Sequence, residues 1–492
     1  MPETGPTWKL SLAGEATVCV APTLAQMTPY VLLEQEDWFE DEIRFVRRLV
    51  EPGMTMLDVG ANHGVYSLAA ACRIGGGRIW AFEPASAPRA RFAESVALNG
   101  FGTVVAILPV ALSDTERTVE MAIAENSELG SLHGGAGPAE TVRVRTLDAC
   151  AAEHFPDARI DFVKLDAEGE EVAILRGGAR IFAEQSPLVM FELREGAKVN
   201  AGLPEAFRAL GYDLFVLVAE AGLLLPATGA EEALNLFACK PDRAAALAAR
   251  GLLLRSEAEL PREPAGVSPA DLAERLGGLE CAAAWRGAWN LALVRRLPGP
   301  YMFALGTALA AASAAPARRV ALWLAAWTEL ARLPAAVASR TEVDLLRLHL
   351  LHCLGRRAAA HRLARTLERQ FGTRKAQVDW PFVAPLAADW RRATGQTPET
   401  WAAYRVAEYV TIHGAASSYF LADIVCGRVG LHLGDPDRSA RICRTIALAT
   451  AKRLRRGEGG GAVVMAANAA AWRDLSAEML YASMPSNSTE DR

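Results

Sequence analysis

The chain of 492 residues is longer than a single compact core usually requires, so its length predicts two or three domains. Hydrophobic residues make up 51% of it and charged residues 22%, which is typical of a soluble globular protein and excludes a disordered or fibrous one. Residues 1–245 carry a net charge of −15 and residues 246–492 a net charge of +10 that comes almost entirely from arginine. Arginine-rich solvated helix faces explain the basic half best; an anionic partner or docking against the acidic half are the alternatives.

Three simple patterns are missing from the sequence. No apolar run reaches the roughly 18–20 residues that a membrane-spanning helix needs. Met1–Leu10 lacks the basic and apolar regions of a secretory signal. The eight cysteines are scattered without a C-x-x-C pair, which argues against a zinc site or a disulfide framework. We therefore expect a cytoplasmic protein without a membrane span.

The first predicted elements lie in an N-terminal segment, residues 1–53. Asp37–Val50 has Phe39, Ile43 and Val46 at helical spacing, so we expect an amphipathic lead-in helix there. Pro52 and Gly53 then end the helix and open the first strand.

Residues 54–245 alternate short apolar runs with helical stretches, the pattern of a parallel α/β sheet. The predicted strands are Thr55–Val59, Arg78–Phe82, Val104–Val110, Asp161–Leu165, Leu188–Glu192, Leu214–Leu217 and Leu234–Cys239. The predicted helices are Gly64–Arg73, Pro88–Leu98, Glu170–Ala183 and Leu203–Leu210. An additional strand pair, Val119–Ile123 and Thr141–Leu147, surrounds a glycine-rich loop at Gly130–Pro138.

The character of the chain changes after this region. Residues 246–269 contain three prolines and are predicted to be a linker, followed by an α-helical domain over residues 270–484 and a flexible tail over 485–492. Leu351–Gly355 and Gly430–Gly434 are each followed by apolar residues 8 and 12 positions after the glycine. Paired helices around a glycine turn indicate an irregular array of helical hairpins, with a tetratricopeptide-like array as a further interpretation.

The most informative motif is Asp58-Val-Gly60-Ala-Asn62-His-Gly64, at the end of the first predicted strand. Its glycines allow a tight turn and a close approach to a ligand. The spacing lacks the third glycine of a dinucleotide site and the Gly-Lys-Ser/Thr of a phosphate-binding loop. An acidic residue before the first glycine would repel phosphate and favour an amino group or a sulfonium.

Glu83 ends the second predicted strand, where a carboxylate can accept hydrogen bonds from both ribose hydroxyls. A ligand with a ribose, a positive charge and no phosphate is S-adenosylmethionine, which is our predicted cofactor, bound through Asp58, Gly60, Asn62, Gly64 and Glu83. The alternative is that Asp58 only caps the helix of an α/β domain without a ligand.

Residues of about 37–240 resemble the FkbM family of S-adenosylmethionine-dependent methyltransferases. The matching segments occur in the family's order and are Asp58–Ser67, Phe82–Pro84, Ala111–Asp114, Thr146–Asp148, Asp161–Glu171, Leu175–Ala179 and Pro187–Glu192. The resemblance implies a seven-stranded class I, Rossmann-like methyltransferase domain and O-methyl transfer, often to sugars or other secondary metabolites. It covers about two fifths of the chain and leaves the acceptor and the helical half open.

Two further groups of residues are assigned to the site. Ser113 and Asp114 are predicted to contact adenine, unless they form only a turn. Asp166 and Glu168, which follow one strand, and Glu192, which ends the next, are the predicted catalytic residues: Asp166 or Glu168 as the base and Glu192 positioning the acceptor. The alternative role for Glu168 is a helix cap, which does not exclude catalysis. We expect no metal, although the three carboxylates would also suit magnesium or calcium.

These patterns predict an enzyme that methylates a hydroxyl group on a glycan or small molecule. The alternatives are a catalytically weak scaffold that binds the cofactor, or a methyltransferase of a protein or nucleic acid recruited by the helical domain. Nucleic acid is disfavoured because the basic half lacks interleaved aromatic platforms. A nicotinamide oxidoreductase is disfavoured by the missing third glycine. The helical domain is expected to bind a protein partner, restrict access or self-associate.

Overall fold

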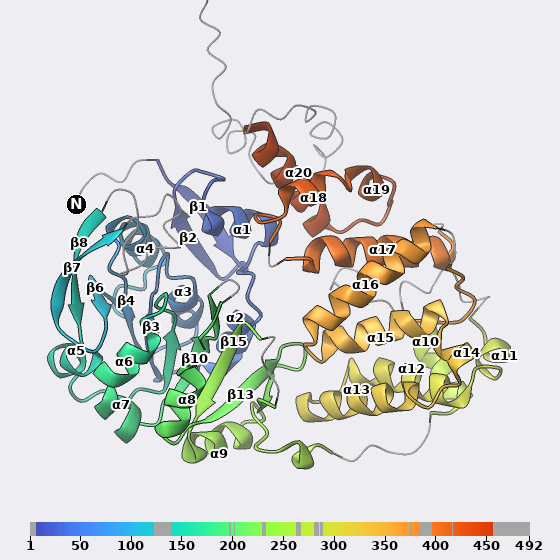
Figure 1. Cartoon of the computed structure of the whole chain (residues 1–492), viewed down its shortest axis with the longest axis horizontal. Coiled ribbons are helices and arrows are strands. Elements are labelled where there is room, and N and C mark those ends of the chain that lie inside the picture. Colours follow the sequence, from blue (N-terminus) through green and yellow to red (C-terminus); the bar gives the residue numbers. More distant parts are fainter. Residues whose placement is uncertain are drawn as a thin grey trace, which may run out of the picture. The chain divides into compact units, whose positions relative to one another are not determined.

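The computed structural model describes residues 6–122, 139–195, 198–200, 202–228, 233–261, 267–279, 285, 289–373, 376–383, 396–415 and 417–455. Within these residues the chain forms two compact units (Figure 1). The first contains the chain up to Leu217 and Leu224–Arg255, and the second contains Val218–Leu223 and the chain from Ser256 onward. The predicted loop Gly130–Pro138, the glycines at 457–461 and the predicted tail lie outside the described residues.

An eight-stranded sheet forms the centre of the first unit, in the order β14-β13-β15-β10-β9-β3-β4-β5. Its strands are β3 (Thr55–Val59), β4 (Arg78–Phe82), β5 (Val105–Leu108), β9 (Phe162–Leu165), β10 (Leu188–Glu192), β13 (Asp213–Val218), β14 (Leu223–Pro226) and β15 (Asn235–Cys239). The pairs from β10 to β5 are parallel, whereas β15 runs antiparallel to both β10 and β13. The predicted seven-stranded α/β domain is therefore confirmed, and β14 extends it at one edge.

Helices cover both faces of this sheet (Figure 1). They are α3 (Val65–Ala71), α4 (Ser86–Leu98), α5 (Leu147–His154), α6 (Glu171–Gly177), α7 (Ala179–Glu184), α8 (Gly202–Ala209) and α9 (Pro241–Ala249). The predicted helix Glu170–Ala183 is divided into α6 and α7 at Gly178. A Cβ at Gly178 would lie 2.8 Å from the Leu147 side chain, so this close contact with α5 favours glycine at the division.

The predicted strand Val104–Val110 is interrupted, because Pro109 has no amide hydrogen for a continuous ladder. The chain continues as β6 (Val110–Leu112), which joins β7 (Arg117–Ala122) and β8 (Ala139–Arg145) in a separate three-stranded sheet. The predicted pairing of Val119–Ile123 with Thr141–Leu147 is present as the antiparallel pair β7–β8. Two short strands, β11 (Arg194–Glu195) and β12 (Lys198–Val199), follow β10.

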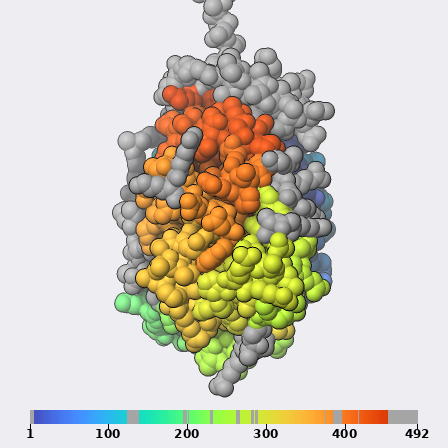
Figure 2. Space-filling model, turned by 90° about the vertical axis from the view of Figure 1, so that its right-hand side faces the viewer, coloured from blue at the N-terminus to red at the C-terminus, as the bar shows by residue number. Residues whose placement is uncertain are grey.

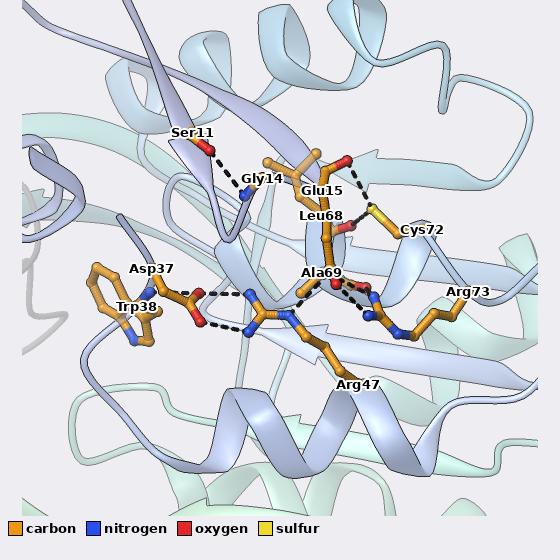
Figure 3. A network of polar contacts seen from close by, with 10 residues as sticks. All are labelled: Ser11, Gly14, Glu15, Asp37, Trp38, Arg47, Leu68, Ala69, Cys72 and Arg73. Atoms are coloured by element: carbon orange, nitrogen blue, oxygen red, sulfur yellow. Dashed lines mark hydrogen bonds and ion pairs between the residues drawn. The ribbon is translucent and has the colours of Figure 1, made fainter. Parts of the chain in front are cut away.

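The N-terminal segment forms a hairpin and two helices: β1 (Trp8–Leu12), β2 (Ala16–Val20), α1 (Met27–Gln35) and α2 (Glu42–Leu49). The lead-in helix is shorter than predicted, since Asp37 precedes it and forms a two-pronged ion pair with Arg47, both N–O distances being 2.6 Å (Figure 3). Glu15, in the hairpin turn, accepts from Arg73 at 2.5 and 2.8 Å and lies 3.2 Å from Arg47 Nε. These contacts fasten the hairpin to α2 and to the end of α3.

The second unit is helical over its described residues from Ser256 onward. Its elements are the 3-10 turn η2 (Glu257–Glu259) and α10 (Pro269–Gly277), α11 (Leu291–Val294), α12 (Gly299–Ala311), α13 (Pro316–Leu330), α14 (Ala335–Ala338), α15 (Thr341–Cys353), α16 (Arg357–Gly372), α17 (Pro398–His413), α18 (Ala422–Cys426), α19 (Val429–Leu433) and α20 (Ala440–Arg455). Figure 1 shows its helices following one another roughly in chain order, and the face seen in Figure 2 changes colour from yellow-green to orange-red in the same order.

The two glycine turns compared in the sequence differ in the structure. Gly355 separates α15 from α16 with a left-handed φ of +74°, whereas Gly434 follows the five-residue helix α19 with a φ of −75°. A tetratricopeptide-like array therefore stays a prediction. None of the described helices, in either unit, has the length and apolar character to cross a membrane.

Candidate active site

Asp58 lies in β3, beside the start of α3, and its side chain is buried. One carboxylate oxygen, Oδ2, accepts hydrogen bonds from the Ser67 amide at 3.1 Å and the Ser67 hydroxyl at 2.6 Å. The other oxygen, Oδ1, is buried and has no partner among the described residues. Burial raises the pKa of Asp58, against the opposing effects of Lys164 and Ser67. Asp58 thus holds the first turn of α3, as a helix cap would, and keeps one oxygen for a ligand.

The loop after β3 has a left-handed backbone at three of its five positions: Gly60 at φ +73°, Asn62 at +50° and Gly64 at +75°. A Cβ at Gly60 would lie only 1.8 Å from the backbone oxygen of Asp166. A Cβ at Gly64 would lie 2.1 Å from the ring of Phe92. Both glycines are therefore required by backbone conformation and by close packing, which explains the spacing of the motif.

Glu83 follows β4 and is buried beside this loop. Its Oε2 accepts from the Asn62 amide at 2.7 Å and its Oε1 from the Ala85 amide at 2.8 Å. Burial raises the pKa of Glu83 to about 7, although both amides favour the ionised form. The carboxylate is held in place by backbone donors, and each oxygen retains a lone pair for a ligand hydroxyl.

Ser113 and Asp114 follow β6 and contact the α6 region. The Ser113 hydroxyl donates to Glu170 Oε2 at 2.6 Å, and Asp114 Oδ2 lies 3.5 Å from Nε of Arg176. The approach is close, because a Cβ at Gly177 would lie 2.1 Å from the Ser113 carbonyl oxygen. Adenine recognition by Ser113 and Asp114 stays a prediction.

Asp166 follows β9 and lies against the loop after β3, where its amide donates to the Val59 carbonyl at 3.2 Å. Its Oδ2 accepts from Lys164 Nζ at 2.8 Å, and the same ammonium donates to the Gly60 carbonyl at 3.2 Å. Burial by itself would lower the pKa of Lys164, but the carboxylates of Asp166 and Asp58 outweigh burial and raise it. Lys164 therefore remains a buried cation between the predicted cofactor loop and Asp166.

Glu192 ends β10, the strand next to β9, and its carboxyl group is hydrogen-bonded to Asp166. Burial, followed by the charge of Asp166 and this hydrogen bond, raises the pKa of Glu192 to about 9. At neutral pH the carboxyl group of Glu192 therefore carries a proton. Of the predicted catalytic residues, the structure brings Asp166 and Glu192 into direct contact.

Glu168 lies in the turn between β9 and α6 and has a left-handed φ of +49°. The turn is held by Glu171, whose Oε1 accepts from the amides of Ala167 at 2.9 Å and Gly169 at 3.1 Å. The residue at the N-cap of α6 is Glu170, whose side chain makes no capping hydrogen bond. The charge of Glu168 still acts on Glu192, so this turn belongs to the same acidic region.

Three residues of this region were not predicted from the sequence. Glu40 accepts from the Tyr66 hydroxyl at 2.9 Å and from Asn235 Nδ2 at 2.9 Å. The Lys164 ammonium lies 5.7 Å from the centre of the Tyr66 ring, and Asn235 is paired with Glu192 between β10 and β15. The sequence contains little indication of these three residues. Tyr66 comes just after the glycine motif, but Glu40 and Asn235 lie outside it and match no pattern of their own. The described residues contain no group of three or more His, Cys, Asp or Glu side chains suited to a metal ion.

Comparison with known proteins finds one matching family model. Residues 58–214 match the family model described as the methyltransferase FkbM domain. A search of curated proteins finds no significant match.

Solved structures with a similar fold include several methyltransferases. The methyltransferase FkbM from Methylobacillus flagellatus KT is 15% identical, with 38% of this chain and 43% of that chain covered and a TM-score of 0.27. A SAM-dependent O-methyltransferase from Thermotoga maritima is 14% identical, with 40% and 64% covered and a TM-score of 0.25. A SAM-dependent methyltransferase from Aquifex aeolicus is 16% identical, with 42% and 91% covered and a TM-score of 0.25. The chain matches less than half of the length of the Methylobacillus flagellatus protein.

Proposed function

We propose that this chain, an S-adenosylmethionine-dependent methyltransferase whose residues 58–214 form a methyltransferase FkbM domain, methylates a hydroxyl group on a sugar, glycan or other small metabolite. The observation that carries the proposal is the contact of Lys164 with both the Gly60 carbonyl and Asp166. It joins the predicted cofactor loop to a carboxylate that can take a proton from an acceptor hydroxyl.

The residues at the ends of β3 and β4 fit the cofactor. Asp58 has a buried oxygen that finds no partner in the described part of the chain, which suits the cationic part of the ligand. Glu83 is fixed by two amides and can accept from ribose hydroxyls. Between them, the loop Gly60–Gly64 is held in its turn by the close packing of Gly60 against Asp166 and of Gly64 against Phe92. When bound, the cofactor supplies an electrophilic methyl group.

The residues at the ends of β9 and β10 then act on the acceptor. The main contribution expected of the enzyme is to hold the acceptor oxygen in line for the transfer. As this oxygen gains its new bond, its proton must leave, and we assign that proton to the Asp166 carboxylate, with Glu168 as the alternative base. Glu192 already holds a proton at neutral pH, so it suits a role in positioning the acceptor by hydrogen bonding.

The remaining parts of the proposal concern the whole chain. We propose a methyltransferase domain over residues 54–245, a linker over 246–269 and a helical domain over 270–484 that binds a protein partner or self-associates. A cytoplasmic location is supported by the seven cysteines of the described residues, all of which are free thiols.

The acceptor is tested by comparing methylated glycans and small metabolites from cells with and without the gene by mass spectrometry. We expect at least one compound to lose a methyl group in the absence of the gene. Re-expression of the wild-type chain should restore that group, whereas the Asp166→Asn variant should not. If the only methylated products that disappear are proteins or nucleic acids, the proposed acceptor class is wrong.

A further inference from the structure

Trp38 is held in a fixed orientation just before α2, in the first unit. Its backbone amide donates to Asp37 Oδ1 at 2.8 Å, and Asp37 is itself paired with Arg47 (Figure 3). Its indole Nε1 donates to Glu40 Oε2 at 2.8 Å. The Phe39 ring lies beside the indole, with 4.8 Å between the ring centres and 49° between the planes. These contacts fix both ends of an aromatic side chain that is only partly buried.

The contacts of Glu40 place this indole beside the candidate active site. Glu40 Oε2 also accepts from the Tyr66 hydroxyl at 2.9 Å, and its Oε1 accepts from Asn235 Nδ2 at 2.9 Å. Asn235 is in turn paired with Glu192 between β15 and β10. Both oxygens of Glu40 thus have protein donors, so Glu40 acts by holding Trp38 at the side of the site where Glu192 ends β10.

A partly exposed indole beside carboxyl groups suits a sugar ring. The C–H groups of such a ring can pack on the electron-rich face of the indole, and its hydroxyls can donate to carboxyl oxygens. Burial and then three neighbouring carboxylates raise the pKa of Glu192. These carboxylates are Asp166, Glu40 and Glu168, and the Lys164 ammonium is already bonded to Asp166. A phosphate or carboxylate on the acceptor would therefore be repelled here.

We propose that Trp38 forms the acceptor subsite and stacks on a sugar ring that carries no phosphate or carboxylate group. This inference rests on the proposed function and narrows its acceptor to one class of sugar. Trp38 determines specificity and takes no part in proton transfer or in cofactor binding. Glu40 is a positioning residue that acts through Trp38.

The test is saturation-transfer NMR on the full-length chain with S-adenosylhomocysteine bound. The probes are methyl glycosides of neutral hexoses, deoxyhexoses and amino hexoses, with hexose phosphates and uronic acids as their anionic counterparts. We expect at least one of the glycosides to receive saturation, strongest at the C–H protons on one face of its ring, and the anionic sugars to receive none. Trp38→Ala should weaken binding of that glycoside about three- to tenfold, the range for a lost aromatic contact, and keep the affinity for S-adenosylhomocysteine within about threefold.

Two further variants accompany this one. Trp38→Phe keeps an aromatic face but has no donor for Glu40, so it should retain part of the glycoside affinity, and it replaces Trp38→Ala if that variant does not fold. Trp380→Ala is a matched control, because Trp380 in the helical unit is also partly exposed and has an aromatic neighbour, Tyr301, with 5.3 Å between the ring centres. This control should bind the glycoside like the wild type.

An unchanged glycoside affinity in folded Trp38→Ala would overturn the inference. Equal losses of glycoside and S-adenosylhomocysteine affinity would overturn it too, because Trp38 would then act on the cofactor. A wild-type chain that binds S-adenosylhomocysteine but none of the glycosides, or that binds the anionic sugars equally well, would exclude the proposed class of sugar. A wild-type chain that does not bind S-adenosylhomocysteine would instead refute the cofactor site of the proposed function.

Discussion

At the scale of single residues, the carboxyl group of Glu192 carries a proton at neutral pH. The folded chain raises the pKa of Glu192 to about 9, chiefly through burial and then through the charge of Asp166, against about 4.3 for an unperturbed glutamate. Between these two values the folded state binds a proton that the unfolded state has released. The free energy of unfolding should therefore fall as pH rises from about 4.5 to 9, by up to about 1.4 kcal/mol per pH unit from this group.

Glu192→Gln should remove this contribution, because glutamine keeps a hydrogen-bonding amide and has no proton to lose. We expect the variant to gain stability relative to the wild type as pH rises, measured by denaturant unfolding at pH 6, 7, 8 and 9. Glu153→Gln is a suitable control, since Glu153 is exposed on α5 and its pKa is lowered by Arg145. Parallel stability curves for Glu192→Gln and the wild type over this range would contradict the raised pKa of Glu192.

Single substitutions can distinguish the residues proposed to bind the cofactor from those proposed to act on the methyl acceptor. Glu83→Ala should weaken S-adenosylhomocysteine binding by about tenfold or more, because it removes the carboxylate predicted to bind the ribose.

Asp166→Asn and Glu168→Gln should bind S-adenosylhomocysteine within about threefold of the wild type. Once the acceptor is identified, loss of the proton acceptor should reduce turnover by about 10²–10⁴-fold. Unchanged binding in folded Glu83→Ala would refute the ribose assignment, and full activity in both acidic variants would refute the base assignment.

At the scale of elements, the site depends on the close approach of two loops. A Cβ at Gly60 would lie 1.8 Å from the Asp166 carbonyl oxygen, a backbone atom that cannot move without displacing β9. Gly60→Ala should therefore cost about 2–4 kcal/mol from overpacking and left-handed strain together, and should weaken cofactor binding.

Gly53→Ala separates these two effects. Gly53 has a φ of +85°, but a Cβ there would meet nothing within 4 Å. This control should lose only the roughly 1 kcal/mol of left-handed strain and keep cofactor binding. Similar losses for the two variants, measured by denaturant unfolding and calorimetry, would show that the approach of Gly60 to Asp166 is not what limits the site.

The elements also show what could be predicted from sequence. The predicted bounds of β3, β4 and β10 agree with the structure, since each is a short apolar run that begins near a turn and ends at or near a polar residue. The hairpin β1–β2 was missed because its alternation is brief, and it is held by ion pairs of Glu15 with Arg47 and Arg73 that no local pattern reveals (Figure 3).

In the candidate site, too, residues with a local sequence pattern could be predicted, whereas residues placed by tertiary contacts could not. Asp58, Gly60 and Glu83 follow from strand ends and glycine spacing, which are local features of the sequence. Glu40 was not predicted because its role depends on tertiary contacts with Tyr66 and with Asn235, which is 195 residues away along the chain. Hydrogen bonds over such separations follow from the folded topology, and one sequence contains no period or spacing that records them.

At the scale of the whole molecule, S-adenosylhomocysteine should change the thermal stability of the two units differently. All the proposed cofactor and catalytic residues lie in the first unit, whereas the second unit consists of Val218–Leu223 and the helical part of the chain from Ser256 onward. A ligand that binds only the folded first unit stabilises it by about 2.7 kcal/mol at a concentration one hundred times its dissociation constant. We therefore expect two transitions in scanning calorimetry of the full chain, only one of which moves to higher temperature with S-adenosylhomocysteine.

The variant Glu342→Ala identifies the other transition. Glu342 is fully buried in α15, and its Oε1 accepts from the amides of Asp379 at 2.7 Å and Trp380 at 2.9 Å and pairs with Arg340 at 3.1 Å. Its removal leaves two backbone donors without their acceptor and leaves Arg340 with Asp379 as its carboxylate partner, which should destabilise the helical unit by about 2–4 kcal/mol. The transition that does not respond to S-adenosylhomocysteine should then move to lower temperature while the responsive one stays in place. A single transition that shifts as a whole under both perturbations would mean that the two units unfold cooperatively, and cofactor binding would then stabilise the helical unit as well.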